Sequence, residues 1–263
     1  MIFLKLGGSL ITEKDKPSAA RQDVIARAAK EIAAAQAADP GLQILLGHGS
    51  GSFGHFPAKK HGTREGVRIP EQWIGFIEVW RQAAALNHLV MDALLATGLP
   101  AISFSPSAGA LAQDGEVASW ELQPILAAVA AGLVPVVYGD VAFDVARGGT
   151  VLSTEDLFLH LVAVLKPTRI LLAGDEEGVM ANYGRKPQLI PDISLATYPQ
   201  FAASISSSIA PDVTGGMAGK VESMLELVRQ LPNCDVYIFS GLAPGNIEKA
   251  LSGAALGTRL HAG

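Results

Sequence analysis

Two glycine-rich turns, each following a short apolar segment, carry most of the chemistry that this sequence suggests. The first spans residues 5–9 and closes the apolar segment Ile2–Leu6, and the second spans residues 47–55 after the apolar segment 44–46. Glycine lets the backbone approach an anion closely and point several N–H groups at it. Two such turns near each other would hold two phosphates, one on a donor and one on an acceptor. The sequence therefore predicts a phosphotransferase for small molecules.

Lys5 is unusual because it lies within an otherwise apolar predicted strand. A buried ammonium is costly unless an anion accompanies it. One interpretation is a structural salt bridge, with Asp140 or Asp175 as the partner. The other, which we favour, is a cation that contacts the transferring phosphoryl group, and the two roles are compatible.

Lys220 follows a glycine pair, residues 215–216, at the start of a helix predicted over residues 217–231. A helix N-terminus carries partial positive charge and unpaired N–H groups, so it attracts phosphate. Thr214 or Asp212 is expected to cap it. The segment lacks the spacing and the Ser/Thr of a Walker A loop. We favour a phosphate-binding lysine over an ordinary surface lysine.

His55 ends the second glycine turn, where its imidazole N–H could donate to a phosphate oxygen. A lone histidine is more often structural, and His48 is the more ambiguous of the two because its ring could point back into the core. Lys14 lies in a polar loop, and only its position after the first glycine turn makes it a candidate for function.

Residues 49–54 match the G-x-G-x-x-G pattern of dinucleotide-binding proteins. That fingerprint requires a helix that opens inside the motif. The following segment, residues 55–62, is polar and interrupted by Pro57, so it is predicted to be non-helical. The pattern therefore disfavours a dehydrogenase and favours a loop that wraps an anion.

The wider pattern alternates short apolar runs with amphipathic segments, which predicts βαβ units and a mainly parallel sheet covered on both faces. Residues 178–193 are predicted to form a turn and a small hairpin, a kink is possible at Gly75, and Pro167 is the most plausible lobe boundary. Predicted strands span residues 2–6, 43–46, 101–104, 133–138, 170–173, 236–239 and 257–260, and predicted helices span 21–38, 71–97, 121–131, 153–165, 217–231 and 246–251.

Composition narrows the class of protein. The chain has 263 residues, 49% hydrophobic and 17% charged, with a net charge of −5 and a pI near 5.7. A basic face for nucleic acid is not indicated. No apolar run reaches the length of a membrane span, and the N-terminus lacks a signal peptide, so a cytoplasmic protein is expected. The single cysteine, Cys234, permits no internal disulfide and no cysteine zinc cluster, and no metal-ligating residues are predicted.

These motifs together resemble the amino-acid kinase superfamily and, within it, the isopentenyl phosphate kinase family. The matching segments are residues 4–14, 48–60, 138–141 and 212–222. The glycine-rich loop that ends in His55 best distinguishes this family from others in the superfamily, many of which lack that histidine. The resemblance implies a three-layer αβα sandwich, a homodimer, ATP with Mg2+, and transfer of the γ-phosphoryl group of ATP to isopentenyl phosphate. It also implies one domain with an acceptor-binding lobe over residues 1–166 and a nucleotide-binding lobe over residues 167–263.

The resemblance assigns roles to individual residues. Lys5, Lys14, His55 and Lys220 are the implied catalytic residues, and Lys14 would stabilise the transition state. The implied nucleotide contacts are Lys5, Leu6, Gly7, Gly8, Ser9, Gly51, Asp175, Gly216 and Lys220. The implied acceptor contacts are Ser50, Gly54, His55 and Gly139, with Phe76 and Val79 as candidates for the pocket of the apolar tail.

The sequence departs from the family pattern at Ser50, where a glycine is common, and over residues 174–179 and 76–80. A fosfomycin-type phosphonate kinase of the same fold is the nearest alternative, although the apolar residues 76–80 favour a hydrocarbon tail. The other alternative is a non-catalytic nucleotide-binding protein. The retained lysines argue against it.

Overall fold

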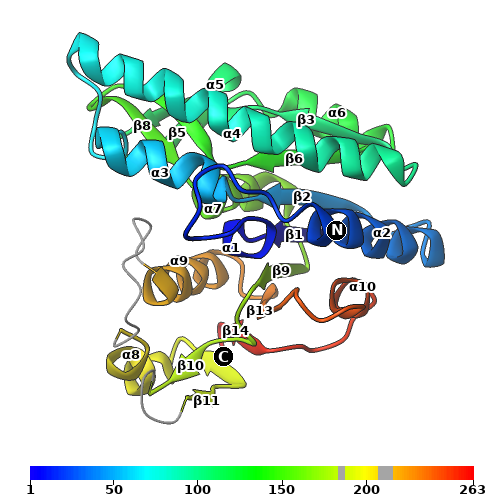
Figure 1. The fold of residues 1–263 in the computed structure, drawn as a ribbon. Coiled ribbons are helices and arrows are strands. Elements are labelled where there is room, and N and C mark those ends of the chain that lie inside the picture. The colour runs from blue at the N-terminus through cyan, green and yellow to red at the C-terminus, as the bar shows by residue number, and fades with distance from the viewer. Residues whose placement is uncertain (183–186, 207–215) are drawn as a thin grey trace.

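The computed structural model describes residues 1–182, 187–206 and 216–263, and its central feature is an eight-stranded sheet (Figure 1). The strand order is β12-β14-β13-β9-β1-β2-β6-β3, and every neighbouring pair is parallel except β13 with β14. The prediction of a mainly parallel sheet is confirmed. The strands are β1 (Ile2–Leu6), β2 (Ile44–His48), β3 (Ala101–Phe104), β6 (Val134–Tyr138), β9 (Arg169–Gly174), β12 (Asp192–Ser194), β13 (Asp235–Ser240) and β14 (Thr258–His261).

Helices cover both faces of this sheet, which gives three layers. On one face pack α2 (Gln22–Ala38), α4 (Pro70–Ala96) and α10 (Asn246–Leu251), and on the other pack α6 (Gln123–Ala130), α7 (Thr154–Leu165) and α9 (Gly216–Gln230). Side chains of β1 alternate between the two cores, with Leu4 on the first and Phe3 on the second, as the twofold period of a strand requires. The predicted αβα sandwich is confirmed.

The sequence predicted helix α7 correctly, and local hydrogen bonds explain where it begins. Ser153 caps α7 by accepting a hydrogen bond from the Asp156 N–H, and the Asp156 carboxylate accepts one from the Ser153 N–H. This reciprocal capping box satisfies two N–H groups at the helix start. The helix ends at Lys166 in a left-handed conformation, immediately before Pro167. A lobe boundary at Pro167 stays a prediction.

A second sheet of four strands, in the order β5-β4-β7-β8, was not predicted from the sequence. These strands are short, and tight turns join β4 to β5 and β7 to β8, so an alternating pattern hardly develops in any of them. The predicted hairpin forms from β10 (Met180–Ala181) and β11 (Gln188–Leu189), whereas α8 (Tyr198–Ser206) was not predicted. The missed strands are β4 (Ala110–Gln113), β5 (Glu116–Trp120), β7 (Asp140–Asp144) and β8 (Gly148–Leu152), and two short helices are α1 (Gly8–Ile11) and α5 (Pro106–Gly109).

The prediction that residues 55–62 are non-helical is wrong. Helix α3 (Gly51–His61) begins inside the second glycine turn and continues through Pro57 to Gly62, whose φ of 60° ends it. A proline inside a helix costs roughly 3 kcal/mol. Burial of the Phe53, Pro57 and Ala58 side chains opposes that cost. The second glycine turn therefore leads into a helix N-terminus.

Gly75 explains how closely α3 and α4 pack. A Cβ atom on Gly75 would lie 2.4 Å from the Cβ of His61, so no larger residue fits between the two helices there. Helix α4 is continuous across Gly75. The glycine thus serves close helix packing.

Candidate active site

The turns singled out from the sequence lie together at one edge of the large sheet. Because β1, β2 and β6 are parallel neighbours, their carboxyl ends meet at that edge. Backbone hydrogen bonds connect the turns that follow them: the Gly49 N–H donates to Leu6 O at 3.0 Å, and the Gly139 N–H donates to His48 O at 3.0 Å. The edge is therefore a continuous surface of main-chain atoms.

The two glycine turns touch through their backbones. A Cβ on Gly8 would lie 2.6 Å from Cα of Gly51, and a Cβ on Gly49 would lie 2.8 Å from the nitrogen of Gly8. Thr12 ties the turns together, because its Oγ1 donates to Gly8 O at 2.7 Å and accepts from the Ser52 N–H at 2.9 Å. The predicted proximity of the turns is confirmed. Thr12 was not singled out from the sequence.

Lys5 forms a buried ion pair with Glu155, at the start of α7. The partner is therefore neither Asp140 nor Asp175, the two carboxylates that the salt-bridge interpretation named. Burial works to raise the pKa of the Glu155 carboxyl, but the ammonium groups of Lys5 and Lys220 outweigh it and hold that pKa below its usual range. Glu155 therefore stays ionised between two lysines. The partner of Lys5 is 150 residues away along the chain, so no local signal pointed to it.

Asp140 has a different set of partners. Its carboxylate accepts hydrogen bonds from Ser105 Oγ at 2.9 Å and from the Val141 N–H at 2.8 Å, and it is fully buried. Burial raises the pKa of this carboxyl. Asp140 thus connects the start of β7 to the start of α5.

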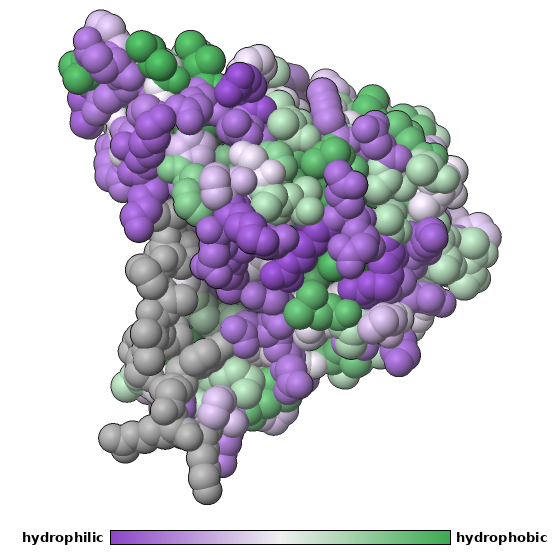
Figure 2. Space-filling view, in the orientation of Figure 1, coloured by the Kyte–Doolittle hydropathy of each residue, from purple (hydrophilic) through white to green (hydrophobic). Residues whose placement is uncertain are grey.

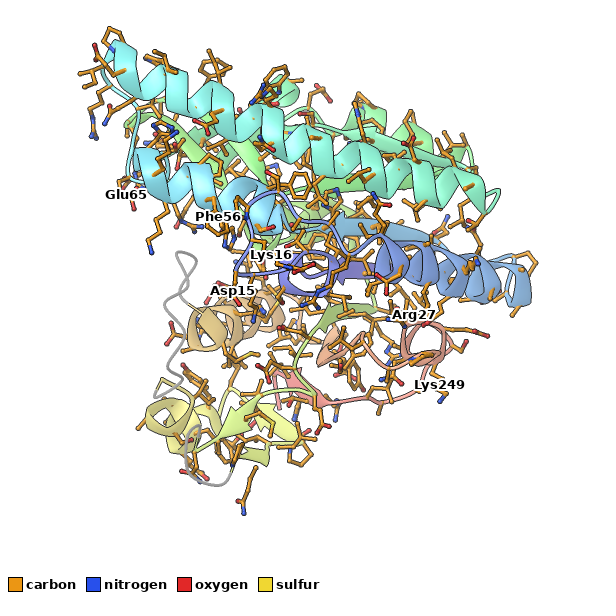
Figure 3. All side chains as sticks on the ribbon, in the orientation of Figure 1. Asp15, Lys16, Arg27, Phe56, Glu65 and Lys249 are labelled. Atoms are coloured by element: carbon orange, nitrogen blue, oxygen red, sulfur yellow. The ribbon has the colours of Figure 1, made fainter. Side chains whose placement is uncertain are left out.

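Lys14 pairs with Asp175 at the end of β9. The ammonium lies 2.8 Å from Oδ2 of Asp175, and Ser9 Oγ donates to Oδ1 at 2.6 Å. Burial tends to raise the pKa of Asp175, but the hydrogen bonds from Lys14 and Ser9 prevail and hold it below its usual value. Hydrophilic side chains gather across the middle of this face of the molecule (Figure 2), and Figure 3 marks Asp15 and Lys16, the neighbours of Lys14. The first turn, Lys14 and Asp175 thus meet at an accessible rim.

Two adjoining cavities share Glu155 and Lys220. The first is lined by Lys5, Gly7, Leu172, Ala173, Gly174, Asp175, Glu176, Met217 and Ile238 in addition to the shared pair, and the second by Arg64, Ser153, Asp156, Gly216, Gly219 and Ser223. Lys220 lies one turn into α9, as predicted, with Gly216 at the first position of that helix. The expected caps, Asp212 and Thr214, lie outside the described residues. Lys5, Lys220, several glycines and the first residue of α9 therefore line two cavities that share Glu155, and such a lining suits a chain of phosphates.

The residues assigned to the acceptor lie on the β2 and β6 side. A Cβ on Gly54 would lie 2.2 Å from Ser50 Oγ, and one on Gly139 would lie 3.6 Å from the Ser50 nitrogen. His55 is the next residue of α3 and is half-buried. Gly51 has a φ of 49°, a left-handed conformation that favours glycine. Ser50, Gly54 and Gly139 are therefore close neighbours.

Phe76 and Val79 lie in a separate apolar cluster with Val67 and Val141, and none of these four residues lines either cavity. The ring centroid of Phe76 is 5.1 Å from that of Trp73. Both side chains are buried. A role in holding an apolar tail stays a prediction.

Comparison with known proteins identifies the family. Residues 1–240 match the model of the amino acid kinase family, so the chain belongs to that family. It is 36% identical to the isopentenyl phosphate kinase of Methanothermobacter thermautotrophicus, over 99% of this chain and 98% of that protein, and 32% identical to the one from Methanocaldococcus jannaschii, over 99% and 98%. A crystal structure of isopentenyl phosphate kinase superposes with a TM-score of 0.84 and 33% identity, covering 99% of both chains. The resemblance drawn from the motifs is confirmed.

No helix in the described part of the chain is long and apolar enough to cross a membrane.

Proposed function

We propose that this protein transfers the γ-phosphoryl group of ATP to the phosphate of isopentenyl phosphate, which gives ADP and isopentenyl diphosphate. The observation that carries the proposal is the backbone contact between the two glycine turns beside the Lys5–Glu155–Lys220 cluster. Full-length similarity to isopentenyl phosphate kinases supports the choice of acceptor.

The reaction requires two anions to be held in line. An acceptor phosphate oxygen forms a bond to the γ-phosphorus while the bond from that phosphorus to the bridging oxygen of ADP breaks. Phosphoryl transfer depends mainly on positioning and charge neutralisation, and an ionised phosphate needs no general base. We assign neutralisation of the transferring group to Lys5, Lys14 and Lys220, and this accounts for a site rich in cations and N–H groups.

The nucleotide is assigned to the first glycine turn and the cavity beside it. Leu6, Gly7, Gly8, Ser9, Gly51, Asp175 and Gly216, with Lys5 and Lys220, are the proposed contacts. The Gly7 N–H donates to Ala173 O at 2.8 Å, so the turn is held against the end of β9. A turn held in place at the N-terminus of a helix offers backbone N–H groups in fixed positions, which suits the binding of a polyphosphate.

Mg2+ is proposed to accompany ATP. The described residues contain no group of three or more His, Cys, Asp or Glu side chains arranged for a metal. Mg2+ commonly binds through substrate phosphates, water and one or two carboxylates, and Asp175 and Glu176 line the first cavity. The residues present therefore fit a nucleotide-borne ion, which would neutralise phosphate charge when bound.

The acceptor phosphate is assigned to Ser50, Gly54, His55 and Gly139, and its tail to the region of Phe76 and Val79. Residues 1–166 and 167–263 would then form the acceptor and nucleotide lobes. A homodimer and a cytoplasmic location also stay proposals.

The test of the acceptor is a coupled assay of ADP release with isopentenyl phosphate, longer prenyl phosphates and fosfomycin. We expect turnover with isopentenyl phosphate. Turnover with fosfomycin alone would favour a phosphonate kinase, and ATP binding without turnover on any acceptor would favour a non-catalytic protein.

His55→Ala tests the acceptor site. Loss of a hydrogen bond to a charged phosphate is expected to raise the acceptor KM roughly ten- to a hundredfold, with the nucleotide Kd unchanged. His88→Ala is the matched control, since His88 is exposed on α4. An equal loss of acceptor and nucleotide binding would contradict the assignment.

A further inference from the structure

His48, the last residue of β2, is fully buried directly before the second glycine turn, and the mechanism above gives it no role. Its ring stacks on Tyr138, with centroids 5.3 Å apart and planes 6° apart. Nδ1 lies 3.1 Å from the carbonyl oxygen of Gly49, and Nε2 lies 3.1 Å from Oδ1 of Asn87. Both ring nitrogens therefore have polar partners.

The partners of the ring determine where its proton lies. The Gly49 carbonyl oxygen can only accept, so Nδ1 must carry the hydrogen. Burial, assisted by the nearby charge of Lys5, lowers the pKa of His48, so the ring is neutral and Nε2 has no hydrogen.

Asn87 must then donate to Nε2. Exchanging the oxygen and nitrogen of the Asn87 amide, which have nearly the same shape, gives Nε2 a donor. The same exchange brings the amide oxygen to the place of Nδ2, 3.0 Å from Ser103 Oγ, where it can accept a hydrogen bond from that hydroxyl. In this single arrangement the Ser103 hydroxyl, the Asn87 amide, both ring nitrogens of His48 and the Gly49 carbonyl all form hydrogen bonds.

This arrangement fixes the peptide between Gly49 and Ser50. In a trans peptide the C=O and the N–H point in opposite directions, so holding the Gly49 carbonyl toward His48 turns the Ser50 N–H the other way. No described residue accepts a hydrogen bond from that N–H, although Ser50 is buried. The Ser50 nitrogen is 3.6 Å from where a Cβ of Gly139 would be. A buried N–H without an acceptor is costly unless a ligand satisfies it.

We propose that His48 is a positioning residue: its Nδ1–H holds the Gly49 carbonyl, Asn87 fixes the ring in that tautomer, and the Ser50 N–H is thereby aimed at the acceptor phosphate. The proposal rests on the assigned acceptor site. The tautomer itself is independent of which acceptor the enzyme uses.

The first experiment measures that tautomer in the wild-type protein without substrate, by long-range 15N–1H correlation of 15N-histidine-labelled protein, with His48→Asn used to assign the signal. We expect His48 to be neutral with its hydrogen on Nδ1. A hydrogen on Nε2, or a doubly protonated ring at neutral pH, would overturn the proposal whatever the substrate.

The second experiment compares His48→Asn with His48→Gln. The asparagine amide can occupy the place of Nδ1 and still donate to Gly49, whereas the glutamine amide reaches the place of Nε2. His48→Gln is expected to raise the acceptor KM roughly ten- to a hundredfold, as a misaligned contact does. We expect the nucleotide Kd to stay constant and His48→Asn to remain near the wild type.

His88→Asn, on the exposed face of α4, is the control, and melting temperatures separate altered folding from altered binding. Equal acceptor KM values for the two His48 variants, or equal losses for acceptor and nucleotide, would overturn the proposal. If neither variant folds, the tautomer measurement on the wild type still decides it.

Discussion

Two lysine–carboxylate pairs lie at the same edge of the sheet and differ in their exposure. The side chains of Lys5 and Glu155 are 10% and 11% exposed, whereas those of Lys14 and Asp175 are 54% and 23% exposed. Separating a buried pair leaves an uncompensated charge at a cost of roughly 3–5 kcal/mol, whereas an exposed pair contributes about 0–1 kcal/mol. The same chemistry therefore gives one permanent pair and one that a ligand can readily displace.

The comparison assigns different tasks to the two lysines. Glu155 pairs with the Lys5 ammonium inside the protein and interacts with Lys220 as well, so these groups are preorganised before any ligand arrives. Lys14 can exchange Asp175 for a phosphate oxygen with little loss of stability. Three predictions test this division, beginning with the largest effect.

Glu155→Gln should be the most damaging change. It leaves the Lys5 ammonium buried beside a neutral amide, so we expect the free energy of unfolding to fall by roughly 3 kcal/mol. Urea denaturation measures this, with Glu226→Gln as the control, because Glu226 on α9 pairs with Arg229 in an ion pair that is far more exposed than that of Glu155. Unchanged stability would mean that the buried pair is not permanent.

Lys14→Ala should leave the fold intact and slow the reaction. Removing a cation that we assign to the transferring phosphoryl group is expected to lower kcat by roughly a hundred- to a thousandfold, while stability changes by less than about 1 kcal/mol. Steady-state kinetics and nucleotide titration test this, with Lys16→Ala in the same loop as the control. A wild-type kcat would remove Lys14 from the mechanism.

Asp175→Asn should have the smallest effect on stability, and the effect should depend on pH. Because the pKa of Asp175 is depressed in the folded protein, its contribution is complete above the unfolded value of about 4 and is lost as the pH falls through the folded pKa. The stability difference between wild type and variant should be constant from neutral pH to about pH 5, at no more than about 1 kcal/mol, and then shrink. Urea midpoints across this range provide the measurement; a difference that grows in acid would contradict it.

Local signals predicted much of the fold. The strand before the first turn, the capping box at Ser153 and the helix Asn246–Leu251 are encoded by neighbouring residues, and all three form. Helix α3 was missed because Pro57 is a local helix breaker, whereas the packing that supports α3 involves α4.

The candidate site was predicted only in part, because some of its contacts join residues that are far apart in the sequence. Glycine turns are visible in sequence, but the partner of Lys5 and the bridging role of Thr12 depend on which strands become neighbours. Glu155 falls within the helix predicted over residues 153–165, and nothing local marked it as a partner of Lys5. A lysine in an apolar strand did indicate that an anion accompanies it, without indicating which one.

The contact between Gly8 and Gly51 has a consequence for how acceptor specificity can evolve on this fold. Since the turns meet through main-chain atoms, the separation of the two proposed phosphate positions is set by covalent geometry and is insensitive to side-chain rotamers. A side chain larger than that of glycine at either position would clash with the other turn and increase the distance between the two turns. New acceptors must therefore be accommodated by mutations farther out, around the remainder of the molecule being phosphorylated, while the distance that the phosphoryl group travels is inherited unchanged.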